Sequence, residues 1–302
     1  MTTTLRDDDI PQALGPGKHR GPNTTAAPLV ATGPLAAAVP LMAHRSCRLV
    51  GMLGVVADYD VFARFYDAVM GDRATQAHQL AKWIDEYCEK PVTSLLELGC
   101  GTGSVLAGLS HVPSRTGLDR SDRMLAVARR KLSGVRLVGG DIETFELGAR
   151  FDVVVCVFDT INHLLDFAEW ERLFDRVHRH LADSGLFIFD VNTVGQLRGL
   201  GDSPPWVLDF GGNVLIMNVE FDGHQMSTWD IRVFEPSGSS RYTLHREVVR
   251  ELGVPLVDIR SALTSSRFRI LGEIDPGGGV ATDESRRVHF LCRASDDVPL
   301  KL

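Results

Sequence analysis

The chain has 302 residues, of which 44% are hydrophobic and 24% are charged, and its formal net charge is −7. These proportions are typical of a globular protein with one or two domains. The 39 acidic residues outnumber the 32 Lys and Arg residues, which argues against a general nucleic-acid binder, because such proteins need basic side chains to replace phosphate counterions. No apolar stretch has the length of a membrane-spanning helix, so we expect no membrane partner.

The cysteines indicate a reducing environment. Their number is odd and no Cys-x-x-Cys pair occurs, so we predict neither a disulfide framework nor a metal site. We therefore expect a cytoplasmic protein. The five positions are Cys47, Cys88, Cys100, Cys156 and Cys292.

The first 56 residues differ from the rest. Six of the fourteen prolines fall within the first forty positions, and proline at this density breaks both helices and strand ladders. We predict a disordered leader over residues 1–56. Two alternatives stay open: a signal peptide around Leu35–Met42, whose apolar run Pro40 interrupts, and a translation start near Met52.

The chain from Tyr59 onward has regular periodicity. Apolar spacing predicts helices over Tyr59–Met70 and Ala74–Tyr87. Strands and helices then alternate, which predicts an α/β fold with a Rossmann-like, doubly wound, mostly parallel sheet. The predicted strands are Val92–Leu98, Thr116–Asp119, Val135–Val138, Phe151–Phe158 and Gly185–Val191, and the predicted helices are Ser104–Leu109, Ser121–Lys131 and Asp166–Leu181.

After the fifth strand the pattern becomes antiparallel. Three alternating runs follow, and a hairpin turn at Asp222-Gly223 joins the first two. The runs are Asn213–Phe221, His224–Phe234 and Arg241–Val249. We assign residues 205–249 to an antiparallel insertion and residues 57–204 and 250–302 to the main domain. A helix from Pro255 and two closing strands, Arg267–Ile274 and Arg287–Arg293, would complete a seven-stranded sheet.

A glycine-rich loop follows the first strand and opens a helix, in the run Leu95-Leu96-Glu97-Leu98-Gly99-Cys100-Gly101-Thr102-Gly103. Ligands bind in open α/β sheets at this place, beyond the carboxyl ends of the strands. Gly99 permits a tight turn, Gly101 lets a ligand touch the backbone, and Gly103 lets the helix approach the strand.

Two acids end the next two strands. Asp119 follows Gly101 by 18 residues, where an acid that binds ribose hydroxyls is expected, and Asp141 ends the third strand. A dinucleotide fingerprint would need glycine at position 104, where Ser104 stands. Over roughly Tyr59–Arg293 the sequence resembles the class I S-adenosylmethionine-dependent methyltransferases.

The resemblance implies S-adenosylmethionine as cofactor and a set of residues that contact it. Glu97 would bind the methionine amine, the three loop glycines would line the methionine and ribose, and Asp119 would hold the ribose hydroxyls. The remaining contacts implied are the adenine neighbours Met124, Asp141 and Ile142, the methionine neighbour Phe158, and an aromatic cover formed by Tyr59 and Tyr66. For each tyrosine alone, packing of an amphipathic helix explains the pattern equally well.

The acceptor is expected to be a small molecule. No Asp-Pro-Pro-Tyr-like tetrapeptide follows the fourth strand, which disfavours methylation of nucleic-acid bases. The insertion makes the chain similar to glycine N-methyltransferase and to deoxyaminosugar N-methyltransferases, and it would form a lid over the acceptor. A hydroxyl acceptor would need a proton acceptor, for which His163 and His245 are candidates, and Asp159 would orient an amine or His163. Transfer to N and to O both stay open, as does a homodimer.

Two other functions remain to be distinguished from a methyltransferase. A cofactor-binding regulator with this fold and no turnover would keep the glycines and acids intact. A nucleotide-dependent oxidoreductase would bind NAD instead of S-adenosylhomocysteine.

Overall fold

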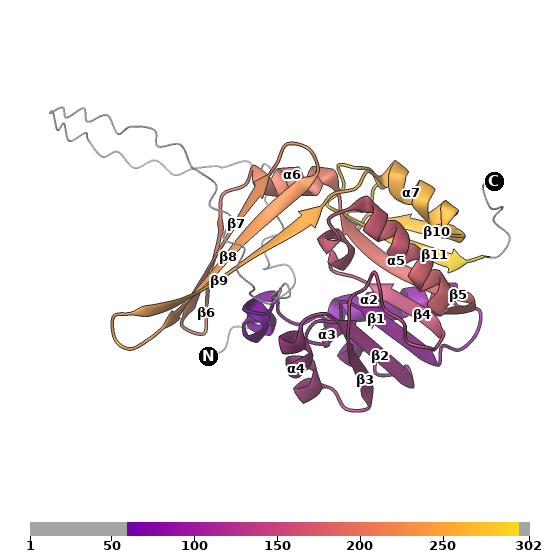
Figure 1. Cartoon of the computed structure of the whole chain (residues 1–302), viewed down its shortest axis with the longest axis horizontal. Coiled ribbons are helices and arrows are strands. Elements are labelled where there is room, and N and C mark those ends of the chain that lie inside the picture. Colours follow the sequence, from indigo (N-terminus) through magenta and orange to yellow (C-terminus); the bar gives the residue numbers. More distant parts are fainter. Residues whose placement is uncertain (1–58, 296–302) are drawn as a thin grey trace. The chain divides into compact units, whose positions relative to one another are not determined.

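A computed structural model of the chain describes residues 59–295 (Figure 1). The leader predicted for residues 1–56 lies outside the described residues. Within the described part, no helix is long and apolar enough to cross a lipid bilayer.

The main sheet has the predicted doubly wound topology. Its seven strands lie in the order β10-β11-β5-β4-β1-β2-β3. They are β1 (Ser94–Leu98), β2 (Ser114–Asp119), β3 (Val135–Gly139), β4 (Phe151–Cys156), β5 (Leu181–Asn192), β10 (Phe268–Ile274) and β11 (Arg287–Ala294). The first five strands pair in parallel, whereas β11 is antiparallel to both β5 and β10. Because β1 lies between β2 and β4, the strand order reverses there, and a ligand crevice is expected at the carboxyl end of β1.

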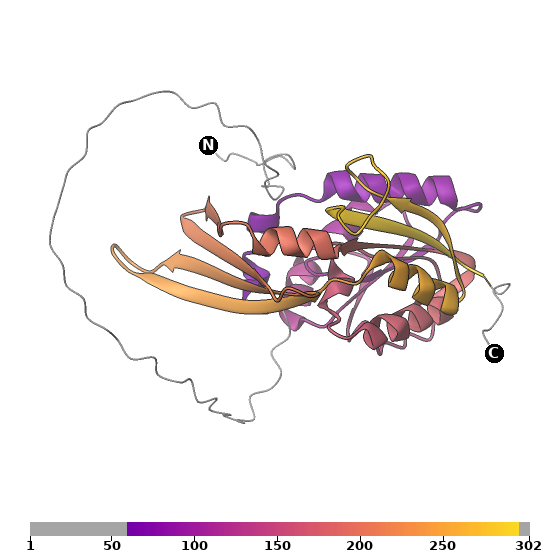
Figure 2. The ribbon, with the colours of Figure 1, turned by 90° about the horizontal axis from the view of Figure 1, so that it is seen from above.

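Different helices cover the two faces of this sheet (Figure 2). The helices α2 (Ala74–Tyr87), α3 (Ser104–Gly108) and α4 (Asp122–Lys131) pack on one face, and α5 (Phe167–His180) and α7 (Leu256–Ser265) pack on the other. β4 shows why both faces are apolar. Val153 and Val155 contact the first layer, and Val154 and Cys156 contact the second, all without solvent exposure. Successive side chains of a strand point to opposite faces, so a strand buried on both sides is a continuous apolar run.

The insertion after β5 is a second, antiparallel sheet in the order β6-β7-β8-β9. Its strands are β6 (Trp206–Phe210), β7 (Asn213–Phe221), β8 (Met226–Pro236) and β9 (Tyr242–Leu252). The predicted hairpin turn is confirmed: Gly223 has a φ of 83°, which glycine adopts readily.

The sequence prediction missed two elements at the start of the insertion. The strand β6 has only five residues and follows two prolines. The helix α6 (Val194–Gly201) contains three glycines, which disfavour helix in isolation. Close packing explains two of them, because a Cβ at Gly195 would lie 2.5 Å from the Asp283 carbonyl oxygen, and one at Gly201 would lie 2.6 Å from Phe221 Cβ.

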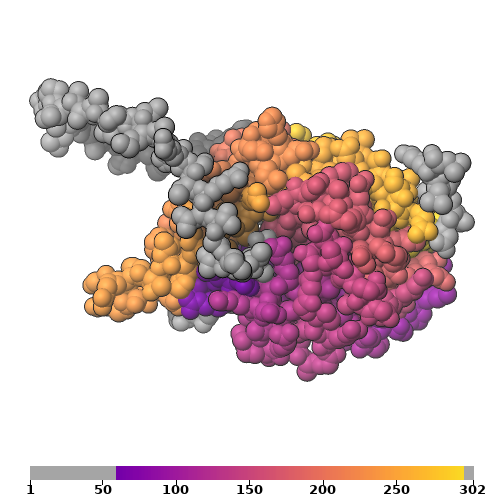
Figure 3. Space-filling model, viewed as in Figure 1, coloured from indigo at the N-terminus to yellow at the C-terminus, as the bar shows by residue number. Residues whose placement is uncertain are grey.

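The N-terminal helix is shorter than predicted. Tyr59 has a left-handed φ of 65°, and the chain then forms a 3-10 turn, η2 (Phe62–Arg64), before α1 (Tyr66–Met70). The predicted start at Tyr59 is therefore wrong. Packing on the insertion explains the difference, since Phe62, Phe65 and Val69 form one apolar cluster with the inner face of the second sheet. In the space-filling view this indigo segment lies against the orange insertion (Figure 3).

Other predicted boundaries hold closely. Asp166 caps α5 with a reciprocal capping box with Glu169. Pro255 was predicted to be the first residue of a helix. It is the N-cap of α7, which begins one position later, at Leu256.

Candidate active site

The glycine loop between β1 and α3 has the backbone geometry that only glycine adopts without strain. Gly99, Gly101 and Gly103 have φ values of 66°, 51° and 77°. A Cβ at Gly99 would lie 2.3 Å from Thr160 Cγ2, and one at Gly103 would lie 2.5 Å from Leu132 Cδ1. A Cβ at Gly101 would meet no atom within 4 Å. Two of the glycines are therefore required by packing, whereas Gly101 borders open space.

Asp119, at the end of β2, is joined to this loop. Its two carboxylate oxygens accept the backbone N–H groups of Gly101 at 2.7 Å and Ser121 at 2.8 Å. Burial raises the pKa of Asp119, and these two hydrogen bonds lower it in part. Each carboxylate oxygen has a further lone pair, so Asp119 can accept two additional hydroxyl donors.

Glu97, near the end of β1, is a buried acid. The residue is 3% exposed, and its Oε2 has no hydrogen-bond partner. Burial raises the pKa of Glu97 well above its usual range, and the negative charge of Asp119 raises it further. Buried polar atoms normally have a hydrogen-bond partner, and a donor group of a ligand could supply one for this oxygen.

The turn after β4 is strained. Phe158 and Asp159 are consecutive non-glycine residues with φ values of 60° and 54°, a conformation that persists only where surrounding groups impose it. The carboxylate of Asp190 accepts both of their N–H groups, at 2.9 and 2.7 Å. Arg287 binds Asp190 at 2.7 Å and Asp159 at 2.5 Å. The ion pairs of Arg287, which are partly shielded from solvent, thus hold the turn in place.

His163 follows this turn in a short 3-10 helix, η3 (Thr160–His163). Its Nδ1 lies 3.0 Å from the Arg250 carbonyl oxygen, which requires a proton on Nδ1. Its Nε2 then carries a lone pair, 3.4 Å from the Tyr59 hydroxyl. The structure thus places the Tyr59 ring against the His163 ring, with centroids 5.3 Å apart. The role of Tyr59 as a cover over the cofactor stays a prediction.

A second carboxylate approaches from β9. Three potential ligand atoms lie within 4.8 Å of one another: a ring nitrogen of His163 and one carboxylate oxygen each of Asp159 and Glu251. Glu251 is 1% exposed and accepts Asn192 Nδ2 at 2.8 Å. These donor types suit a cation, and Arg287 already supplies one positive charge beside Asp159.

The N-terminal segment is held to the loop by polar contacts. Asp60 accepts the Ser121 hydroxyl at 2.5 Å, and Asp67 accepts the Thr102 hydroxyl at 2.6 Å and Lys131 Nζ at 2.7 Å. These contacts place α1 beside the glycine loop and α4.

Tyr66, at the start of α1, is affected by charges of the site. Burial raises its pKa, as do the charges of Asp159 and Asp119, whereas Arg73 lowers it. The Tyr66 ring lies edge-on to the rings of Tyr59 and Phe62, with centroids 6.1 and 6.0 Å apart.

The predicted adenine neighbours lie along the next strands. Met124 is 3% exposed on α4. Asp141 follows β3 and accepts the Glu143 N–H at 3.1 Å, and Ile142 packs against the apolar cluster beneath α5. Their contacts with a cofactor stay predictions.

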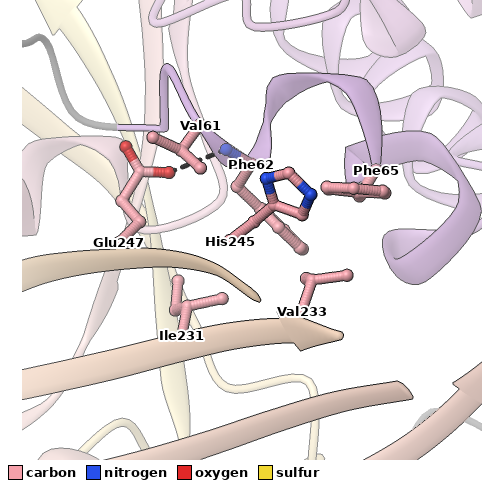
Figure 4. A pocket seen from close by; sticks show the side chains of 7 residues that line it. All are labelled: Val61, Phe62, Phe65, Ile231, Val233, His245 and Glu247. Atoms are coloured by element: carbon pink, nitrogen blue, oxygen red, sulfur yellow. Dashed lines mark hydrogen bonds between the residues drawn. The ribbon is translucent and has the colours of Figure 1, made fainter. Parts of the chain in front are cut away.

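His245 lies elsewhere. It stands five residues before Arg250 on β9, which corresponds to about 16 Å along a strand. Its Nε2 lies 3.0 Å from Glu235 Oε2 and 2.8 Å from Arg64 Nη2. Figure 4 shows its ring between Phe65 and the inner face of the insertion. The hollow there has no room for a water molecule, so the structure does not bring His245 to His163.

Comparisons with known proteins identify the family. A family model described as a methyltransferase domain matches residues 95–185, which contain the glycine loop, Asp119 and the strained turn. The chain is 25% identical over 257 residues to a putative methyltransferase of Geobacillus sp. (strain WCH70), an alignment that covers 78% of this chain and 99% of that protein. The chain belongs to the class I S-adenosylmethionine-dependent methyltransferases.

Other relatives of this methyltransferase align over a shorter part. The dTDP-3-amino-3,6-dideoxy-alpha-D-glucopyranose N,N-dimethyltransferase of Streptomyces fradiae is 34% identical over 155 residues, 49% of this chain and 59% of its own length. A malonyl-[acyl-carrier protein] O-methyltransferase of Bacillus anthracis is 30% identical over 146 residues, 46% of this chain and 51% of its own length.

The fold is also shared over nearly the whole of a solved structure. An S-adenosylmethionine-dependent methyltransferase from Clostridium acetobutylicum ATCC 824 superposes with a TM-score of 0.70 at 24% identity, covering 78% of this chain and 99% of that one.

S-adenosylmethionine is the cofactor of this methyltransferase, and the residues present fit it. The unpartnered Glu97 Oε2 suits an ammonium group, the open side of Gly101 admits a ligand against the backbone, and the free lone pairs of Asp119 suit ribose hydroxyls. The roles of these residues stay predictions that binding measurements test.

Replacing Asp119 by alanine is expected to weaken binding of S-adenosylhomocysteine by about 1–3 kcal/mol, the contribution of hydrogen bonds to a charged group. Isothermal titration calorimetry measures the change. Asp122→Ala, in the exposed first turn of α4, is the matched control. Equal affinities of Asp119→Ala and the wild type would contradict the ribose assignment.

Replacing Glu97 by glutamine is expected to stabilise the ligand-free protein at neutral pH. Because the folded state raises the pKa of Glu97, the folded protein binds more protons, and stability falls as pH rises above the unfolded value of about 4.3. Urea unfolding at pH 4 and pH 8 should therefore show a gain at pH 8 that fades at pH 4. The exposed Glu220→Gln serves as control, and a gain independent of pH would count against this account.

Sequence reasoning missed four charged residues of the site: Arg73, Asp190, Glu251 and Arg287. They belong to elements far apart in the chain, and none lies in a recognisable motif. One signal was available, since Asp190 interrupts the apolar run of β5.

Proposed function

We propose that this methyltransferase transfers the methyl group to an amine nitrogen of a small molecule, bound between the strained turn and β9. The observation that supports this proposal is the charge of the cluster. Arg287 forms ion pairs with the carboxylates of Asp159 and Asp190, and a carboxylate oxygen of Glu251 lies within 4.8 Å of one of Asp159. With all three ionised, the cluster would carry two uncompensated negative charges.

The raised pKa of Glu251 supports a cationic ligand at this cluster of carboxyl groups. Burial raises the pKa of Glu251 well above its usual range, and Asp159 and Asp190 raise it further. A buried carboxyl group avoids its charge by keeping a proton unless a cation compensates it. A protonated amine would supply that cation, and the cluster would then bind it by charge-assisted hydrogen bonds.

The residues around the cluster supply the rest of the chemistry. When bound, S-adenosylmethionine supplies a methyl group on a positively charged sulfur, which a nitrogen lone pair can displace. His163 Nε2 carries the lone pair that can accept the amine proton. Asp159 and Glu251 would orient the nitrogen, and the N-terminal segment would exclude water.

A hydroxyl acceptor is the second candidate. The same Nε2 of His163 could deprotonate a hydroxyl, and an O-methyltransferase is among the relatives. The surplus of carboxylates favours the amine, because a neutral hydroxyl would leave the negative charge uncompensated.

Selective blocking of amines distinguishes the two acceptors. A metabolite extract is treated with acetic anhydride in aqueous bicarbonate, which acetylates amines in preference to hydroxyls. The enzyme is then supplied with methyl-labelled S-adenosylmethionine and with treated or untreated extract. We expect incorporation into the untreated extract alone, and equal incorporation into both would indicate O-methylation.

A variant pair tests the role of the cluster. Glu251→Gln should raise the KM for the acceptor while leaving the affinity for S-adenosylhomocysteine unchanged. Glu220→Gln, an exposed glutamate on β7 of the same insertion, is the control and should change neither. Unchanged acceptor kinetics of Glu251→Gln would contradict the proposed binding of the amine.

A further inference from the structure

Three consecutive residues at the end of β9 are each held by a side chain of the main domain. The three hydrogen bonds run from His163 Nδ1 to the Arg250 carbonyl oxygen (3.0 Å), from Asn192 Nδ2 to the Glu251 carboxylate (2.8 Å) and from Asn162 Nδ2 to the Leu252 carbonyl oxygen (2.9 Å). The insertion returns to the main domain at this point, because β9 ends at Leu252 and the chain then passes into α7. The end of the insertion is therefore fixed to the turn that carries His163.

Asn162 uses its whole amide in these contacts. Its side chain is fully buried. One N–H donates to the Leu252 carbonyl oxygen and the other to the Asn192 carbonyl oxygen, each at 2.9 Å, while Oδ1 accepts the Asn192 N–H at 3.0 Å. An apolar residue of similar size at this position would leave three buried backbone groups without a partner, which is costly. Asparagine is thus matched to its surroundings here.

The Asn162 amide takes the place of a strand neighbour. β4 ends at Cys156, which pairs with Phe189, so the last three residues of β5 extend beyond β4. There Asn162 pairs with both backbone groups of Asn192, as an adjacent strand would, and it donates at the same time to Leu252 on β9. Asn162 therefore links the main sheet to the insertion sheet.

This link bears on the protonation of the next residue, His163. A carbonyl oxygen can only accept, so the contact with Arg250 keeps the proton of the neutral ring on Nδ1 and leaves the lone pair on Nε2. Arg250 stands two residues before Leu252 on the same strand, and carbonyl groups two residues apart on a strand point to the same side. If the end of β9 moved, the ring would lose the acceptor that selects this tautomer, and the wrong tautomer cannot accept a proton at Nε2.

We propose that Asn162 is a positioning residue for methyl transfer. Its amide holds the end of β9 so that the Arg250 carbonyl oxygen selects the His163 tautomer with a free Nε2, and so that Glu251 faces the acceptor. The part played by Glu251 rests on the amine binding proposed above, whereas the selection of the His163 tautomer does not depend on the acceptor. Asn162 contacts backbone groups and acts through His163 and Glu251.

The imidazole nitrogen resonances of His163 test this assignment. Histidine is labelled with nitrogen-15 in the ligand-free, full-length protein, and the His163 resonances are identified by their loss in His163→Gln. At pH 8.5 we expect the wild type to show a protonated Nδ1 and an unprotonated Nε2. In Asn162→Ala the two resonances should move toward each other, because both tautomers become populated. Asn218→Ala, on β7 of the insertion, is the control and should keep the wild-type pattern.

Catalysis provides a second readout. The initial rate of methyl transfer from labelled S-adenosylmethionine into the untreated metabolite extract should fall at least about tenfold in Asn162→Ala, while the affinity for S-adenosylhomocysteine should stay within about twofold. Asn192→Ala separates the two effects, because it removes the donor to Glu251 but keeps the backbone groups that bind Asn162. It should lower the rate without changing the His163 resonances.

A milder variant keeps the test decisive. If Asn162→Ala fails to fold, as judged by circular dichroism, Asn162→Ser decides, since its hydroxyl can donate only one of the two hydrogen bonds and should shift the His163 resonances part of the way. Unchanged His163 resonances, or an unchanged rate of methyl transfer, in the folded variant would overturn the proposal. Shifted resonances together with unchanged acceptor kinetics of Glu251→Gln would reject amine binding at Glu251 and support the positioning of His163.

Discussion

Replacing Arg287 by methionine is expected to lower the free energy of unfolding by about 3 kcal/mol, because it leaves the buried carboxylate of Asp190 and the partly buried carboxylate of Asp159 without their cation. This figure is at the lower end of the range for removing one partner of a buried ion pair, since 26% of the Arg287 side chain is exposed while Asp190 is only 2% exposed. Chemical denaturation at pH 7 measures the loss.

An exposed ion pair provides the control. Arg198 binds Glu284 with two short hydrogen bonds, but their side chains are 49% and 70% exposed. Arg198→Met should therefore lower the free energy of unfolding far less than Arg287→Met does, as is typical of surface pairs. Amide exchange adds a local readout, because the N–H groups of Phe158 and Asp159 bind Asp190 and should exchange faster in Arg287→Met. Similar losses in the two variants would mean that the cluster does not hold the turn.

Replacing Gly101 by alanine is expected to weaken S-adenosylhomocysteine binding by more than about tenfold, or 1.4 kcal/mol. The new methyl group would meet no protein atom within 4 Å, so it would project into the space that the ligand needs. The left-handed φ of 51° adds a strain of roughly 1–2 kcal/mol to the folded state. Calorimetry measures the first effect and thermal or chemical unfolding the second.

Gly134 separates these two effects. It also has a left-handed φ, of 69°, and a Cβ there would meet no atom within 4 Å, but it precedes β3 in a turn outside the site. Gly134→Ala should thus lose comparable stability and bind S-adenosylhomocysteine normally. If both variants bind equally well, the open side of Gly101 does not face the cofactor.

The central sheet and the glycine loop could be predicted because their signals are local. The continuous apolar run of β4 indicates a strand buried on both faces, and the spacing of Gly99, Gly101 and Gly103 after β1 indicates a ligand-binding turn. The helix boundaries of the N-terminal segment, residues 59–70, could not be predicted from local signals. Its helical spacing from Tyr59 is real, but contacts of Phe62 and Phe65 with the insertion replace one helix by a 3-10 turn and a shorter helix.

The charged part of the site depends on residues that meet only in the folded chain. Arg287 is 128 positions from Asp159, and Arg250, whose carbonyl oxygen orients His163, is 87 positions from that ring. No sequence pattern indicates that the residues of either pair lie close together in the folded chain. The same holds for His245, which has the residue type of a proton acceptor but is held about 16 Å along β9 from the contact with His163.

The sequence by itself therefore determined the order of strands and helices, the glycine loop and the acids that end the strands, because each depends on neighbours within a few turns of the chain. Tertiary structure alone decided which charges are buried together. Burial and ion pairing arise between distant segments, and they determine whether the carboxyl oxygen of an acid such as Glu97 has a partner within the protein.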